Sequence, residues 1–98
     1  MGEDGHTASI FPHQIHFMKS DRVCEVAIHP ETAQKRITLT GPVLCAARRV
    51  CVLVTGEKKA SVLEEITKKE GDYRRFPIAQ VDAADTVFFL DQAAAMQL

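Results

Sequence analysis

The feature that most constrains the fold is a continuous apolar run at residues 50–54, VCVLV, which lies between charged residues and a Thr-Gly pair. Such a run is typical of a strand buried on both faces, as in a parallel sheet covered by helices. Residues 57–69 then have helical spacing, with an inner face of Ala60, Leu63 and Ile66 and a stop at Gly71. A second buried strand is expected at 86–90. This order predicts a right-handed crossover within a parallel sheet.

The rest of the chain reads as further short elements. Strands are expected at 21–29 and 36–40, with a loop between them. Gly41-Pro42 ends the second strand and suits the start of a short apolar helix through residue 47. Asp91 can cap a final helix through residue 96. The pattern predicts an α/β fold. A sheet of three or four short strands covered on both faces would be small and thinly packed, which suggests that a partner half is missing.

Composition limits the classes of function. The chain has 98 residues, enough for one small domain, and its net charge of −1 argues against a nucleic-acid or membrane-surface partner. It contains no run of eighteen apolar residues and no signal-peptide pattern, which makes the cytoplasm the expected location. The odd number of cysteines without a C-x-x-C pair predicts reduced, mostly buried thiols at Cys24, Cys45 and Cys51.

Residues 2–12, GEDGHTASIFP, carry the strongest chemical signal. Gly2 and Gly5 allow a tight turn and a close approach of the backbone to a ligand. If residues 7–11 begin a short helix, His6 lies at its positive end, which favours the neutral ring that a general base needs. Asp4 could orient that ring. Alternatively, His6 only caps the helix and Asp4 bonds its own turn.

Three cations are candidate ligands for an anion. Lys58 and Lys59 stand in the first turn of the expected helix, where they either face an anion held by backbone amides or extend into solvent. Arg36 opens a strand near a sheet edge, where it meets a ligand or pairs with a surface acid. The remaining histidines do not group with cysteines or carboxylates at the spacing of metal ligands, so no metal site is predicted, and Glu3 is expected to be an exposed carboxylate.

These residues resemble a known family in four ordered blocks. Residues 2–12 resemble the G-x-D-G-H-T-A-S-L-F-P signature of 6-phosphogluconolactonases. Residues 36–48 resemble that family's R-x-T-L-T and P-V-L-N-A-A-R stretch, with Gly41 and Cys45 as departures. Residues 55–60 resemble its T-G-x-x-K-A turn, and residues 89–95 its terminal F-L-D-E-A-A-A. The resemblance covers nearly the whole chain.

The resemblance implies a fold, a reaction and a set of roles. The fold is the C-terminal part of a doubly wound, mostly parallel sheet with helices on both faces, so residues 1–98 are expected to be a single partial domain whose N-terminal half is missing. The reaction is hydrolysis of 6-phospho-D-glucono-1,5-lactone, without metal or organic cofactor. His6 aligns with the catalytic histidine and Asp4 supports it. Substrate or phosphate contacts are expected at Arg36, Lys59, Gly2 and Gly5.

Two other functions remain open from the sequence. Glucosamine-6-phosphate deaminases share a D-G-H loop, but theirs continues with a further acid, which residues 7–12 lack. The chain could also be an inactive fragment. We expect it to have little lactonase activity alone and to expose an apolar edge or face of its sheet.

Overall fold

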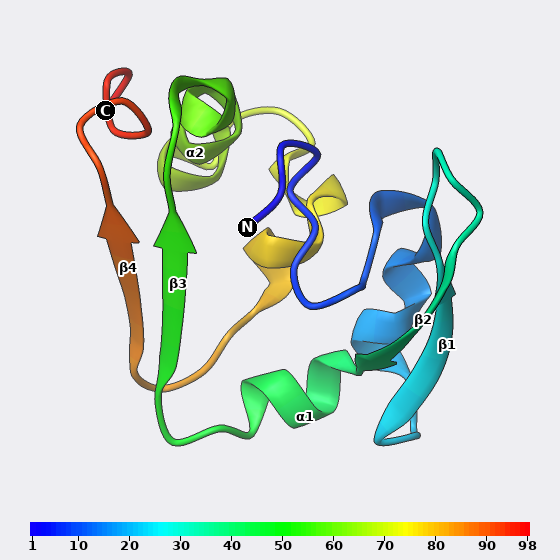
Figure 1. Ribbon diagram of the computed structural model, residues 1–98. Helices are drawn as coiled ribbons and strands as arrows, with labels where there is room; N and C mark the ends of the chain where they lie inside the picture. The colour runs from blue at the N-terminus through cyan, green and yellow to red at the C-terminus, as the bar shows by residue number, and fades with distance from the viewer.

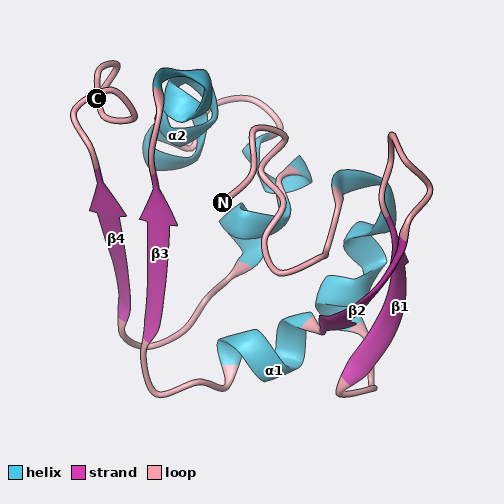
Figure 2. Cartoon of the chain, viewed as in Figure 1, coloured by secondary structure: helices cyan, strands magenta, loops and turns pink.

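The computed structural model describes residues 1–98 and contains two separate two-stranded sheets, which lie on opposite sides of the molecule (Figure 1). Helix α1 runs between them (Figure 2). The strands are β1 (Cys24–Ile28), β2 (Lys35–Leu39), β3 (Val50–Val54) and β4 (Thr86–Leu90). The α-helices are α1 (Gly41–Cys45) and α2 (Ala60–Lys68), and the 3₁₀ segments are η1 (Pro12–Lys19), η2 (Glu57–Lys59), η3 (Tyr73–Arg75) and η4 (Pro77–Gln80).

The β3–α2–β4 unit confirms the predicted parallel pair. β3 and β4 are parallel, with Val52 opposite Phe88 and Val54 opposite Leu90. The expectation of two strands buried on both faces is wrong, because only alternate residues of β3 are buried and no residue of β4 is. The buried residues of β3 form a core with α2, η4 and the C-terminal turn: Val52, Val54, Val62, Leu63, Phe76, Ile78 and Ala94. The α2 helix ends one residue earlier than predicted, because Lys69 takes the left-handed conformation (φ 54°) that ends it.

β1 and β2 form an antiparallel hairpin in a sheet of their own. The α/β class with a parallel sheet is confirmed, and the four strands divide between two sheets instead of forming one. A short connection between two strands permits antiparallel pairing, whereas parallel pairing requires a long crossover. The hairpin packs Ala27 onto a second core, which also contains Ile10, Phe11, Phe17 and Met18.

Two predicted helices do not form. Residues 7–11 are a tight turn instead, with Ala8 at φ 50° and a hydrogen bond from the Ile10 amide to the Thr7 carbonyl (2.9 Å). The first helical segment, η1, begins only at Pro12. The residues after Asp91 form turns rather than a helix. Asp91 still caps these turns by accepting from the Ala94 amide (2.8 Å).

The prediction of mostly buried cysteines is also wrong. Cys24 and Cys51 occupy outward-facing positions of β1 and β3 and are exposed. Cys45 is half-buried, where its thiol lies 3.6 Å from the Gln80 carbonyl and 3.4 Å from the Asp82 amide. All three are free thiols. The alternation of side chains along a strand, which an apolar run conceals, accounts for the two exposed positions.

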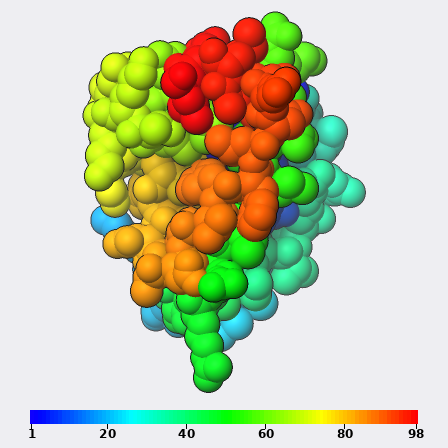
Figure 3. Space-filling model, turned by 90° about the vertical axis from the view of Figure 1, so that its left-hand side faces the viewer, coloured from blue at the N-terminus to red at the C-terminus, as the bar shows by residue number.

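An apolar surface of the parallel sheet is exposed, as predicted. Figure 3 shows β4 and the C-terminal turn at the front of one face of the molecule. Leu53 is 67% and Phe89 54% exposed, and they are neighbours in the register of β3 and β4. Sheets of parallel strands usually bury both faces, so this face lacks its usual cover. No helix in the structure combines the length and the apolar character that crossing a membrane would require.

Candidate active site

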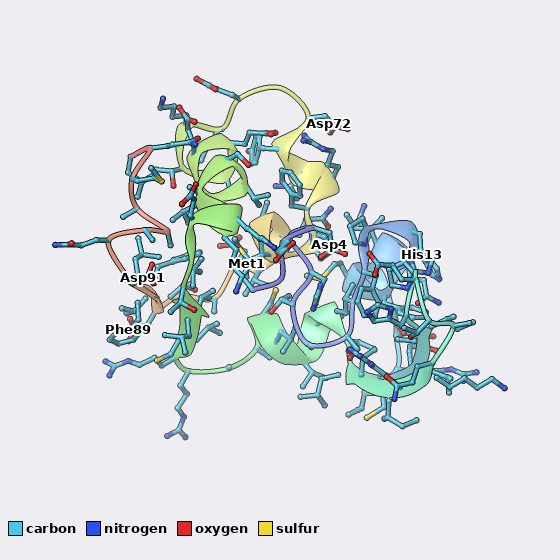
Figure 4. All side chains as sticks on the ribbon, turned by 45° about the horizontal axis from the view of Figure 1, so that its top comes forward. Met1, Asp4, His13, Asp72, Phe89 and Asp91 are labelled. Atoms are coloured by element: carbon cyan, nitrogen blue, oxygen red, sulfur yellow. The ribbon has the colours of Figure 1, made fainter.

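The Gly2–Phe11 loop runs between the two cores and is held by both. Gly5 has φ +79°, which an L-residue adopts only with strain, and a Cβ there would lie 2.6 Å from the Phe76 side chain. The Gly5 carbonyl accepts from the Ile78 amide (3.0 Å), which ties the loop to η4. At its other end Phe11 is fully buried in the hairpin core. Figure 4 shows Met1 and Asp4 in this central position, between the two sheets.

His6 and Asp4 form a hydrogen-bonded pair on this loop. The His6 Nδ1 lies 2.6 Å from the Asp4 Oδ1, which also accepts from the His6 backbone amide (3.0 Å). Because an ionised carboxylate only accepts, this pairing assigns the neutral ring's proton to Nδ1. The Nε2 lone pair is then free, and it makes no hydrogen bond within the chain. The His6 side chain is 28% exposed, so solvent reaches the ring.

Two neighbours set the position of the His6 ring. The Phe11 ring lies 4.7 Å from it between centroids. A Cβ at Gly2 would lie 2.2 Å from the ring's Cε1 and Nδ1, so only glycine leaves room for the imidazole there. His6 is not at a helix N-terminus, which corrects the sequence expectation: its orientation comes from Asp4, Phe11 and Gly2.

Arg36 belongs to the same neighbourhood through Phe11. Its guanidinium carbon lies 5.8 Å from the centroid of the Phe11 ring, close enough for a cation–π contact. Its Nε donates to the Gln34 side chain (2.9 Å), and it forms no ion pair within the chain. The predicted site residues His6 and Arg36 therefore both lie against one buried aromatic ring, and Asp4 is joined to them through His6.

Lys59 lies at the other end of the loop. It is half-buried at the junction of η2 and α2, while Lys58 is exposed. Burial lowers the pKa of the Met1 amino group, and the charge of Lys59 adds to that effect. Hydrogen bonds from the Ala94 and Gly56 amides lower the pKa of Asp91, again with a contribution from Lys59. Lys59 thus stands near the carboxyl ends of β3 and β4, without a hydrogen bond to His6 or Asp4.

A shallow pocket of 230 Å³ opens beside His6. It is lined by Glu3, Asp4, His6, Phe11, His29, Pro30 and Glu31. Sequence reasoning missed His29 and the supporting role of Phe11, because no spacing rule relates residue 29 to residue 6. No group of three or more metal-ligating side chains is present in the chain. A larger cavity of 490 Å³, between α2, η4 and β4, contains none of the predicted site residues.

Known proteins resemble this chain in sequence and in structure. The model of the family described as glucosamine-6-phosphate isomerases/6-phosphogluconolactonase matches residues 1–89. The chain is 42% identical to the 6-phosphogluconolactonase of Haemophilus influenzae, over all of this chain and 43% of that protein. It is 39% identical to the human 6-phosphogluconolactonase, over all of this chain and 39% of that protein.

Solved structures extend the likeness to the fold. The crystal structure of the devB protein superposes with a TM-score of 0.90 at 37% identity, over 99% of this chain and 41% of that one. The structure of the 6-phosphogluconolactonase of Trypanosoma brucei superposes with a TM-score of 0.81 at 33% identity, over 100% of this chain and 40% of that one. The chain thus spans about two fifths of the length of the curated relatives it matches. Both the family match and the shared fold place the chain in the family of glucosamine-6-phosphate isomerases and 6-phosphogluconolactonases.

Proposed function

We propose that the protein carrying this chain is a cytoplasmic 6-phosphogluconolactonase, which hydrolyses 6-phospho-D-glucono-1,5-lactone to 6-phosphogluconate in the oxidative pentose phosphate pathway. The observation that carries the proposal is the His6–Asp4 pair, whose 2.6 Å contact leaves the His6 Nε2 free beside an open pocket. The lactonase names of the similar proteins favour this reaction over the deaminase or isomerase reaction. No metal or organic cofactor is required.

In the proposed reaction, His6 acts first as a base and then as an acid. Its Nε2 takes a proton from water while the water oxygen bonds to the lactone carbonyl carbon. The bond between that carbon and the ring oxygen then breaks. The imidazolium returns its proton to the leaving oxygen, which yields the hydroxy acid and the neutral ring. Asp4 stabilises the imidazolium and keeps the ring oriented through Nδ1.

The remaining site residues have supporting roles in this proposal. Arg36 and Lys59 hold the phosphate or the developing oxyanion, since both are cations without an ion pair in the chain. Gly2 leaves space for the His6 ring, and Gly5 gives the loop its left-handed turn. Both glycines therefore support the loop from outside the pocket lining, and Gly5 is buried.

We further propose that residues 1–98 are the C-terminal portion of a larger lactonase domain and have little activity alone. The chain spans only 43% of the Haemophilus influenzae relative. β3 pairs with β4 on one side, while an apolar pocket of 250 Å³ that Val50, Leu53 and Leu44 help to line opens beside β3. Together with the exposed face at Leu53 and Phe89, this arrangement suits cover by the N-terminal half of the domain.

A hybrid enzyme tests the function directly. In it, this chain replaces the matching 43% of the Haemophilus influenzae relative, and lactone hydrolysis is measured beside that of the 98-residue chain alone. We expect activity from the hybrid and little from the chain. His6→Ala in the hybrid should lower kcat by about 10²-fold or more, because the general base is lost.

His16→Ala is the matched control, since His16 is exposed and lies outside the pocket. It should leave kcat unchanged. A folded hybrid without lactonase activity would contradict the proposed function. An unchanged kcat in His6→Ala would refute the role of His6, and full activity of the 98-residue chain would refute the need for a second half.

A further inference from the structure

We infer that His29 is a second substrate-contacting histidine, which donates a hydrogen bond from Nε2 to the uncharged, hydroxylated lactone end of the substrate. The inference rests on the proposed function and adds a residue and a substrate orientation to it. It starts from the pocket beside His6, whose lining includes His29 from the β1–β2 connection. His6 and His29 both pack against Phe11, with ring centroids 4.7 Å and 5.2 Å from that ring.

Backbone hydrogen bonds assign the position of the proton on His29. Its Nδ1 faces the amides of Glu31 (3.2 Å) and Thr32 (3.3 Å), both of which can only donate. Nδ1 is therefore the acceptor, and the proton of the neutral ring is on Nε2. This is the reverse of His6, whose Nδ1 donates and whose Nε2 accepts. The pocket thus offers one free acceptor and one free donor, each on an imidazole Nε2.

The His29 ring is also held in place before any ligand arrives. The His29 amide donates to the Gln34 carbonyl (2.9 Å), and the His29 carbonyl accepts from the Ala33 amide (3.0 Å). With its two side-chain bonds and the edge-on contact with Phe11, the half-buried ring has a defined orientation. A donor that is fixed in this way binds a substrate hydroxyl at a low entropic cost.

The charges of the pocket indicate which end of the substrate enters it. Glu3, Asp4 and Glu31 line it, while Arg36 and Lys59 lie outside its lining. Three carboxylates repel a phosphate, whereas hydroxyl groups can donate to them. The lactone ring with its hydroxyls therefore faces His6 and His29, and the phosphate points away from this pocket.

Two substitutions in the hybrid enzyme separate a substrate contact from a purely structural role. His29→Asn keeps an acceptor for the turn amides, as Asn does in an Asx turn, but removes the Nε2 donor. His29→Gln places an amide N–H near the Nε2 position but loses the acceptor for the turn. If His29 binds substrate, His29→Asn lowers kcat/KM by about 5- to 10-fold, mostly through KM, and His29→Gln recovers part of the loss.

A kcat/KM that is lower in His29→Gln than in His29→Asn would show a structural role and overturn the inference. A kcat/KM of His29→Asn equal to that of the unmutated hybrid would also overturn it. Thermal unfolding of each variant checks that it folds. In the unmutated hybrid, adding the 6-phosphorylated δ-lactam analogue of the substrate, whose ring is uncharged and resists hydrolysis, should shift the NMR signals of the His29 ring and leave those of His16 in place. Absence of a His29 shift would also overturn the inference. Failure of the proposed function itself has a different result: the unmutated hybrid folds but has no lactonase activity.

Discussion

The two sheets of this molecule differ in how completely their residues are packed, and the site loop depends on both. The parallel pair has the larger core, under α2, but exposes its other face at Leu53 and Phe89. The hairpin is smaller and packs on η1 through Ala27. Gly5 joins the loop to the first core through Phe76 and Ile78, and Phe11 joins it to the second. The position of His6 is therefore fixed by two anchors that fold around different sheets.

The largest effect is expected from removing the anchor on the hairpin side. Phe11→Ala removes a fully buried ring that contacts His6, His29 and Arg36. The substitution should lower the free energy of unfolding by about 3–5 kcal/mol. Chemical denaturation measures the loss. Phe89→Ala is the matched control, because Phe89 is 54% exposed. Equal losses in the two variants would show that Phe11 is not an anchor.

A smaller effect is expected from the anchor on the parallel side. Gly5→Ala forces an L-residue to φ +79° and brings its Cβ to 2.6 Å from Phe76. Left-handed strain costs about 1–2 kcal/mol, and the overpacking adds to it. Gly71→Ala, also at positive φ but with open space around it, isolates the strain from the clash. If both variants lose the same stability, contact with Phe76 does not hold the loop.

The smallest effect is expected from Asp91, which strengthens the parallel pair far from His6. Its carboxylate accepts from the Gly56 amide (3.1 Å) and the Ala94 amide (2.8 Å), and these bonds lower the pKa of Asp91 in the folded state. Ionised Asp91 therefore stabilises the fold above the unfolded pKa of about 3.9, and this contribution disappears as pH falls through the folded value.

Asp91→Ala should accordingly destabilise the chain at pH 7, with a difference that shrinks below about pH 4. Unfolding curves at several pH values measure this difference. Asp21→Ala serves as the control, because the exposed Asp21 side chain makes no hydrogen bond or ion pair in the chain. A difference for Asp91→Ala that does not change between pH 7 and pH 3 would contradict the role of the ionised carboxylate.

The prediction of secondary structure succeeded where one local signal dominated. The apolar run of β3 and the helical spacing of α2 each predicted the right element, although β3 is covered on one face only. It also located both strands of the hairpin, but it failed at residues 7–11, where a tight turn replaces the expected helix, and it did not predict that the hairpin forms a sheet of its own. These outcomes depend on contacts that a local pattern does not contain.

The sequence by itself determined the chemistry available to this protein: a histidine two residues after a carboxylate in a glycine-rich loop, and the apolar segments that fold beside it. The folded structure decided what surrounds that histidine. The Nδ1 proton is assigned by Asp4, the ring is placed by Phe11 and Gly2, and Arg36 and His29 arrive from β2 and the hairpin turn. Asp4, Gly2 and Phe11 are close to His6 in the chain, whereas the positions of Arg36 and His29 come from packing between segments that are distant in it.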